Sequence, residues 1–196
     1  WFGWFGFNGG SAFAADGVAA QAVLNTFVAG AVGMGAWLAI EWKRDGHATT
    51  LGGASGVVAG LVAITPAAGF VGGLAPIVFG FVASVCCYFA IQLKAKFGYD
   101  DSLDVVGIHM AGGIIGGVLL GFFADASVGG VDGLFFGDGG LVISQVIAIV
   151  SVIGYSGIVT FGLAKLLDDV MGIRASSDEE LTGLDQTQHA ETAYVD

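Results

Sequence analysis

The chain has 196 residues, of which 55% are hydrophobic and 12% are charged, and its formal net charge is −11. The mean hydropathy is +0.82, and the apolar residues form long uncharged blocks instead of alternating faces, which is typical of membrane helices. A soluble helical protein with a large core is the alternative, and this composition argues strongly against it.

The apolar blocks predict one partial and five full membrane spans. The partial span runs from Trp1 to about Ala15, and its start inside a hydrophobic element indicates a fragment. Each full span has ~20 residues or slightly more, enough to cross ~30 Å of hydrocarbon. Pro66 lies near enough to the end of the third span to be tolerated there. The full spans are expected at about Val18–Trp42, Leu51–Val71, Leu74–Leu93, Leu103–Ala124 and Val142–Leu166.

The basic residues predict the orientation of these spans. All six follow the second, fourth and sixth spans; they are Lys43, Arg44, Lys94, Lys96, Lys165 and Arg174. The positive-inside rule therefore places these three ends in the cytoplasm. We expect a multi-pass protein of the cell membrane with a cytoplasmic C-terminus.

A change of composition after Arg174 divides the chain into two regions. Residues 1–174 are expected to form a transmembrane helix bundle, because the 35 glycines include many inside the spans and small residues let helices approach closely in lipid. Residues 175–196 are expected to form an acidic cytoplasmic tail. This tail is either solvated and disordered, or docked on its own bundle or on a partner.

His109 is the first candidate for chemistry, because it lies among apolar residues in the fifth span. An ionisable residue at membrane depth usually marks a functional site. A neutral imidazole donates a hydrogen bond from one nitrogen and accepts at the other, so it can pass a hydrogen bond or a proton to a small solute. The alternative is a buried structural histidine bonded to a carbonyl.

Three carboxylates, those of Asp100, Asp101 and Asp104, precede His109 at the cytoplasmic end of the fifth span. A carboxylate near a helix N-terminus caps free N–H groups and complements the helix dipole. We therefore expect a capping or structural role for these residues in preference to a ligand role. Asp104 could instead reach a neighbouring helix.

The opening segment is the second candidate, and it reads WFGWFGFNGGSA. Aromatic side chains such as Trp4 and Phe7 commonly form a belt at the membrane interface. The faces of such rings also attract small cations, and the hydroxyl of Ser11 supplies a hydrogen-bond acceptor. The segment is thus either an interfacial belt or a cation vestibule.

Other kinds of site are not predicted. The remaining histidines, His47 and His189, are too far from His109 in sequence to suggest a metal site, and the adjacent Cys86 and Cys87 have no metal-ligand spacing. No phosphate-binding loop or nucleophile elbow is present. We expect no metal, no cofactor, no nucleic-acid partner and no enzyme activity.

Together these residues resemble the ammonium transporter family (Amt/Mep/Rh). The resemblance implies helices six to eleven of an eleven-helix protomer, with an outside N-terminus, an inside C-terminus and assembly into a homotrimer. The matching pieces cover the chain in order; they are the opening WFGWFGFNGGSA, NTF at Asn25–Phe27, SGVVAGLVAITPAAGFV at Ser55–Val71, YDDSLDVVGIHMAGGIIGG at Tyr99–Gly117 and GLDQTQHAETAY at Gly183–Tyr194.

The resemblance implies roles for several of these residues. His109 resembles the second of two paired pore histidines. Phe7 is similar to one of two stacked phenylalanines that gate the pore from outside, and Ser11 to the hydroxyl that accepts a hydrogen bond from ammonium.

Further positions resemble the pore wall of the family. Trp4, Val58 and Val105 are similar to pore-wall positions, and Thr65 lies in the matching ITPAAG segment near the pore. Asp104 resembles the aspartate at the start of the histidine helix, where a structural role is implied.

The expected function is therefore ammonium transport across the lipid bilayer. Ammonium would be recruited at an outer vestibule, and ammonia would pass through a histidine-lined hydrophobic pore. The resemblance also implies, for many members, a PII-type regulatory protein at the cytoplasmic face. An ammonium sensor that signals through the C-terminal tail is the alternative. A proton-coupled transporter of another cation would need further carboxylates in the middle of the spans, and the sequence has none.

Overall fold

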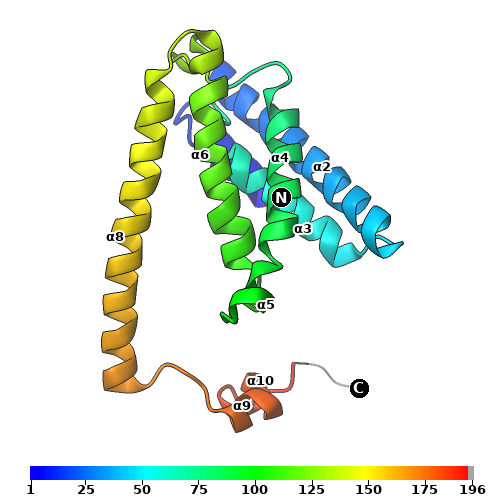
Figure 1. Ribbon diagram of the computed structural model, residues 1–196, viewed down its shortest axis with the longest axis vertical. Coiled ribbons are helices and arrows are strands. Elements are labelled where there is room, and N and C mark those ends of the chain that lie inside the picture. Colours follow the sequence, from blue (N-terminus) through cyan, green and yellow to red (C-terminus); the bar gives the residue numbers. More distant parts are fainter. Residues whose placement is uncertain (194–196) are drawn as a thin grey trace. The chain divides into compact units, whose positions relative to one another are not determined.

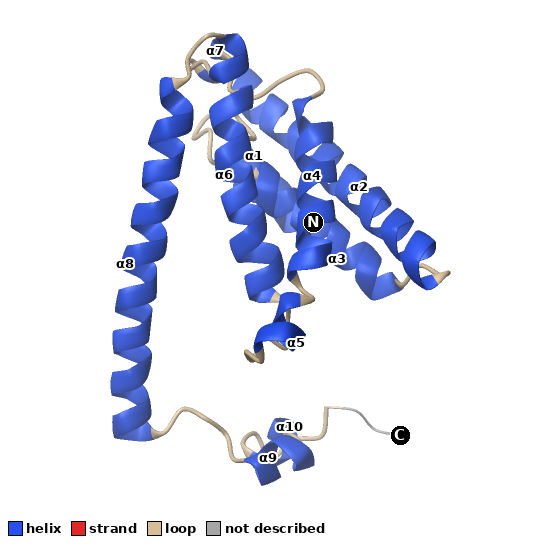
Figure 2. Ribbon diagram, viewed as in Figure 1, coloured by secondary structure: helices blue, strands red, loops and turns tan. Residues whose placement is uncertain are grey.

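The computed structural model describes residues 1–193, and every regular element among them is a helix (Figure 2). The end of the predicted tail, residues 194–196, lies outside the described residues. In chain order the elements are α1 (Phe2–Gly10), α2 (Gly17–Asp45), α3 (Thr50–Ile64), α4 (Ala75–Ala90), α5 (Leu93–Phe97), the π-helix η1 (Val106–Met110), α6 (Ala111–Phe123), α7 (Ala126–Gly129), the 3₁₀-helix η2 (Leu134–Phe136), α8 (Gly140–Met171), α9 (Ser177–Thr182) and α10 (Leu184–Thr187).

Within residues 1–193, four helical segments are long and apolar enough to cross a membrane. They are α2, α4 with α5, η1 with α6, and α8, and they confirm the prediction of an all-helical, polytopic fold. The contacts divide the chain into two units, residues 1–150 and residues 151–196. This division falls inside α8, whereas the composition places the boundary at Arg174.

The third predicted span is wrong in its length, because α3 ends at Ile64 and not at Val71. Pro66 comes two residues later, after the C-cap Thr65, and a proline cannot donate the next helical hydrogen bond. The chain then forms turns that are held from α2. The side-chain amide of Asn25 donates to the carbonyl oxygens of Ala68 at 2.8 Å and Val71 at 2.7 Å. The apolar run continues past the proline, but the helix does not.

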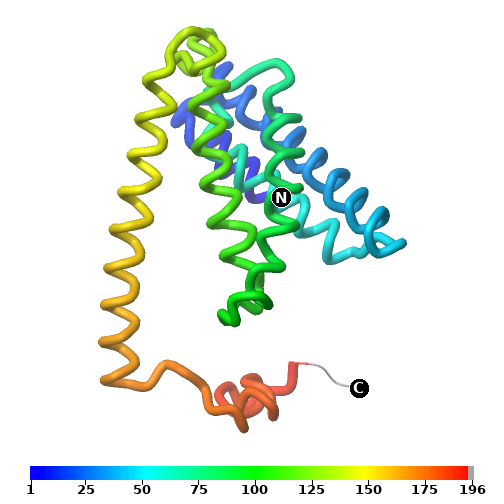
Figure 3. The backbone as a smooth tube through the Cα atoms, viewed as in Figure 1, coloured from blue at the N-terminus to red at the C-terminus, as the bar shows by residue number. Residues whose placement is uncertain are grey.

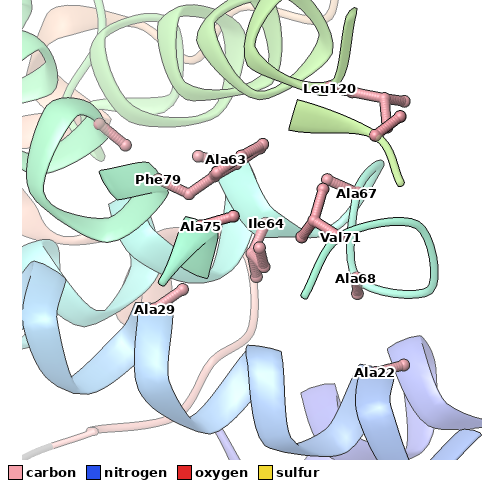
Figure 4. Packing of buried hydrophobic residues seen from close by; sticks show 12 residues of the cluster. Ala22, Ala29, Ala63, Ile64, Ala67, Ala68, Val71, Ala75, Phe79 and Leu120 are labelled. Carbon is pink, nitrogen blue, oxygen red and sulfur yellow. The ribbon is translucent and has the colours of Figure 1, made fainter. Parts of the chain in front are cut away.

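In the first unit, α2, α3, α4 and α6 pack against one another, with α4 beside α6 and α2 beside α3 (Figures 1 and 3). The core between them contains many alanines together with larger side chains such as Phe79 (Figure 4). Helices can therefore approach closely: a Cβ added at Gly116 of α6 would overlap the carbonyl oxygen of Ala63 of α3. This packing agrees with the bundle that the glycine content predicts.

A buried carboxylate joins α2 to α3. Glu41, near the end of α2, accepts hydrogen bonds from the indole Nε1 of Trp37 at 3.2 Å and from the backbone N–H of Thr49 at 2.8 Å. The hydroxyl of Thr49 in turn accepts from the N–H of Gly52 and so caps α3. Gly52 has no side chain, and a Cβ at this position would overlap the Glu41 carboxylate.

The second unit contains the end of α8 and the described part of the tail. Helix α9 begins with a capping box in which Ser176 and Glu179 bond to each other's backbone N–H groups. The backbone N–H and hydroxyl of Ser176 hold the pKa of Glu179 below its usual value. The N–H of Ala193 likewise lowers the pKa of Asp185. The described part of the tail thus contains two short helices, the second of which ends at Thr187.

Candidate functional site

The aromatic segment of the sequence forms α1, and a hydrogen bond fixes it to the end of α3. The indole Nε1 of Trp4 donates to the hydroxyl of Thr65 at 2.7 Å. That hydroxyl donates in turn to the carbonyl of Leu61 at 2.7 Å. The ring of Phe7 lies edge-on to the ring of Trp4, with centroids 6.4 Å apart, and is 63% exposed. The structure therefore brings together Trp4, Phe7 and Thr65, which are 61 residues apart at the extremes.

A cavity of about 310 Å³ lies beside this aromatic group. Its lining is mostly apolar, and its polar members are Asn8, Ser11 and Thr65. The hydroxyl of Ser11 donates to the carbonyl of Phe7 at 2.6 Å, so its oxygen lone pairs remain able to accept. This arrangement can receive a small hydrogen-bond donor next to aromatic rings.

Sequence reasoning missed the buried polar side chains that support the cavity wall. The amide of Asn8 donates to the hydroxyl of Thr26 at 2.9 Å, and that hydroxyl donates to the carbonyl of Ala22 at 2.6 Å. Asn25, the neighbour of Thr26, holds the turns after α3 as described above. The available signal was the adjacent polar pair Asn25 and Thr26 inside an apolar span. The role of this pair becomes clear only from its hydrogen-bond partners.

His109 lies in η1, which packs against α3, α4 and α6. Its side chain is exposed, and within residues 1–193 its ring makes no hydrogen bond to a protein atom. Val105 is also exposed, whereas Ile108 is buried. Val58 of α3 is partly buried and packs against the cluster that contains Ile108.

The three aspartates before His109 have different surroundings. Asp101 caps the helix start, because its carboxylate accepts from the N–H groups of Val105 at 2.8 Å and Val106 at 2.9 Å. Asp104 has a left-handed backbone, with φ of +57°, and its carboxylate pairs with Lys94 at 2.5 Å. Asp100 lies in the same segment and also has an interaction partner.

No metal centre is suggested by the geometry of the described residues. Across residues 1–193, no group of three or more His, Cys, Asp or Glu side chains is arranged to hold an ion. The chemistry that this region offers is thus hydrogen bonding, aromatic contact and one imidazole.

Comparison with known proteins gives a consistent picture. A family model described as "Ammonium Transporter Family" matches residues 1–194. An ammonium transporter of Bacillus subtilis is 48% identical over 199 residues, covering all of this chain and 49% of that protein. One of Aquifex aeolicus is 51% identical over 195 residues, covering 99% of this chain and 46% of the relative. The chain spans about half the length of the curated relatives it matches.

Solved structures show the same similarity. Mep2 of Saccharomyces cerevisiae has a TM-score of 0.86 and 38% identity, with 91% of this chain and 42% of that one covered. A structure named "Sensor Amt Protein" has a TM-score of 0.82 and 25% identity, with 96% of this chain and 46% of that one covered.

Proposed function

Since this chain belongs to the ammonium transporter family, we propose that it forms part of a pore that recruits ammonium from outside and conducts ammonia past His109. The relatives are named as transporters of ammonium and not as enzymes. The observation that carries the proposal is the exposed His109 ring, which stands on an apolar helix without a hydrogen-bond partner among residues 1–193. A neutral imidazole can donate a hydrogen bond to a solute or accept one from it.

The recruitment step rests on the geometry around α1. Ammonium is a compact cation with four N–H donors, and aromatic faces attract such cations by about 0.5–2 kcal/mol. Trp4 offers an aromatic face that its bond to Thr65 keeps in place. The hydroxyl of Ser11 offers the acceptor at the nearby cavity. Phe7, which is more exposed than Trp4, would act as the gate between this vestibule and the pore.

The conduction step follows from the cost of burying charge. An ion in a narrow apolar passage loses its hydration, whereas a neutral molecule loses much less. The walls assigned to this passage, Val58 and Val105, cannot replace the hydration of an ion. Ammonia would therefore travel as the neutral molecule, with its proton moved separately. His109 would accept or donate the hydrogen bond that replaces water at this point.

We further propose that residues 1–174 lie in the cell membrane and residues 175–196 in the cytoplasm. The support is that all six basic residues follow the second, fourth and sixth predicted spans. A homotrimer and a PII-type partner at the cytoplasmic face rest on the family resemblance alone.

A chimera tests the function. Residues 1–196 are joined to the segment of the Bacillus subtilis relative that the match leaves uncovered, and the protein is expressed in cells without their own ammonium transporters. We expect uptake of radiolabelled methylammonium, and a decrease by about tenfold or more in His109→Ala, because the solute loses its hydrogen-bond partner. Met110→Ala is the matched control, since Met110 is the exposed neighbour of His109. Full uptake by His109→Ala would remove this residue from the mechanism.

An ammonium sensor is the second candidate, and the similarity to the structure named "Sensor Amt Protein" favours it. In that case the tail would transmit binding to a partner. Deleting residues 175–196 from the chimera separates the sensor from the transporter. A sensor would still bind ammonium but would lose the cellular response. For a transporter, the deciding measurement is uptake.

A further inference from the structure

The histidine lies in an unusual turn of helix. Residues 106–110 form a π-helix, whose turns hold more residues than those of an α-helix and which occurs frequently at functional sites. In α-helical spacing, His109 would share a face with Gly112 and Gly116, three and seven positions later. These two glycines pack against α3. In the π turn itself, Ile108 is buried and His109 is exposed.

Two contacts hold the π turn against α4. Gly107 lies so close to the end of that helix that an added Cβ would be 2.8 Å from Cα of Ile91. The thiol of Cys87 lies 3.7 Å from the carbonyl oxygen of Ile108, to which it donates. The side of the turn that faces α4 is thus held by packing, and the way in which the chain enters the turn is the remaining influence on the direction of the His109 side chain.

The entry is fixed by the two aspartates. Asp101 caps the first N–H groups, and Asp104 adopts the left-handed backbone that redirects the chain into the helix. A residue with a side chain holds this conformation only where its surroundings stabilise it. The carbonyl of Asp104 then accepts from the N–H of Ile108 at 2.8 Å, which closes the first turn.

Lys94 of α5 contacts both aspartates. Its ammonium lies 2.5 Å from the Asp104 carboxylate and 3.1 Å from the carbonyl oxygen of Asp101. The side chains of Lys94 and Asp104 are 35% and 25% exposed, so the pair is partly shielded from solvent. One cation therefore connects α5 with both ends of the segment that leads into the π turn.

We propose that Lys94 is a positioning residue, which fixes the entry into the π turn and thereby the direction in which the His109 ring points. The importance of that direction for transport rests on the proposed function. The direction of the ring itself does not rest on the proposed function, and it can be measured separately.

Thiol accessibility measures the direction. In the chimera, Cys86 is replaced by alanine, the cysteines of the fused segment are replaced, and buried Cys87 stays. Either His109→Cys or Ile108→Cys is then introduced, and the rate of modification by a small membrane-permeant thiol reagent is measured. We expect faster modification at position 109 than at 108. In Lys94→Met the ratio of the two rates should fall by about fivefold or more.

Three further variants make this result specific. Lys94→Arg keeps the cation and should restore the ratio. Lys96→Met removes the same charge from the same short helix, but Lys96 lies over the ring of Phe97 and should leave the ratio unchanged. Asp104→Asn keeps the size and the tolerance for a left-handed backbone, so it decides the question if Lys94→Met does not fold. An unchanged ratio in Lys94→Met, or in Asp104→Asn in that case, overturns the proposal.

Uptake provides the link to function. With His109 in place, Lys94→Met should lower the maximal rate of methylammonium uptake, and the concentration for half-maximal uptake should stay the same, because the vestibule around α1 is untouched. If the thiol ratio shifts while His109→Ala transports normally, the positioning role stands and the proposed function fails. If the thiol ratio is unchanged while His109→Ala loses uptake, the positioning role fails and the proposed function stands.

Discussion

At the scale of single residues, Asn25 shows how one polar side chain shapes the chain around it. It is fully buried in α2 and donates to two carbonyl oxygens of the turns that follow α3. Its own carbonyl oxygen accepts from the amide of Gln21 at 2.9 Å. These turns carry Thr65 and part of the cavity wall, so Asn25 supports the proposed vestibule without facing it directly.

Asn25→Ala should destabilise the protein by about 1–3 kcal/mol, because it leaves two buried carbonyl oxygens without donors. The midpoint of thermal unfolding in detergent measures this effect. Gln21→Ala is the control, since Gln21 contacts the same network from a partly exposed position and should cost less. Equal midpoints for Asn25→Ala and the unaltered protein would contradict this role.

At the scale of elements, α6 packs on two sides through glycines. Gly116 lies on α3, as described above, and Gly121 lies on the start of α8, where an added Cβ would be 2.8 Å from Cα of Val142. Close approach of this kind brings backbones into contact and increases dispersion attraction between helices in lipid. Helix α6 therefore depends on small residues more than on interlocking large ones.

The pair Gly116→Ala and Gly113→Ala tests this dependence. At Gly116 the new methyl group overlaps a backbone carbonyl, so the helices must separate, at a cost of about 1–3 kcal/mol. At Gly113 nothing lies within 4 Å, and alanine favours the helix by roughly 0.5–1 kcal/mol. We expect the unfolding midpoint of the 196-residue chain to fall in the first variant and to rise slightly in the second. The same shift of the unfolding midpoint in both variants would show that packing of α6 against α3 does not limit the stability of the protein.

The sequence predicts most spans and fails where a distant residue intervenes. The long apolar runs and the placement of the lysines suffice to locate α2, α4, α6 and α8. Helix α3 ends before Pro66, and the path of the turns beyond it depends on Asn25, which lies 43 residues from its partner Ala68. The site divides in the same way, because His109 and Ser11 are recognisable by residue type alone. The bond between Trp4 and Thr65, the π turn and the ion pair of Lys94 with Asp104 are seen only in the folded chain.

At the scale of the whole molecule, charge separates the two ends of the spans. The loops that the proposed orientation places outside contain no lysine or arginine, and their carboxylates serve local structure. Asp125 accepts from the N–H of Ser127, and Asp132 from the N–H of Ala126, both at 2.8 Å. These charges fix loops that face away from the basic residues in the proposed orientation.

Labelling from either side tests this orientation. Ser127→Cys and Ser177→Cys are made separately with Cys86→Ala, and intact bacterial cells are treated with a membrane-impermeant maleimide. We expect modification at position 127 in intact cells and at position 177 only after the membrane is opened, because basic residues favour the cytoplasmic side. Labelling of position 177 in intact cells would reverse the proposed topology.

The junction of α2 and α3 also limits the order in which this protein can change during evolution. A side chain at position 52 would displace the Glu41 carboxylate from the N–H groups of Trp37 and Thr49 that donate to it, so this change is unfavourable while the carboxylate is present. Loss of the carboxylate alone leaves the buried indole N–H of Trp37 without its acceptor. A single substitution at either position 41 or position 52 is therefore unfavourable. Descendants of this sequence should keep Glu41 and Gly52 together or exchange both.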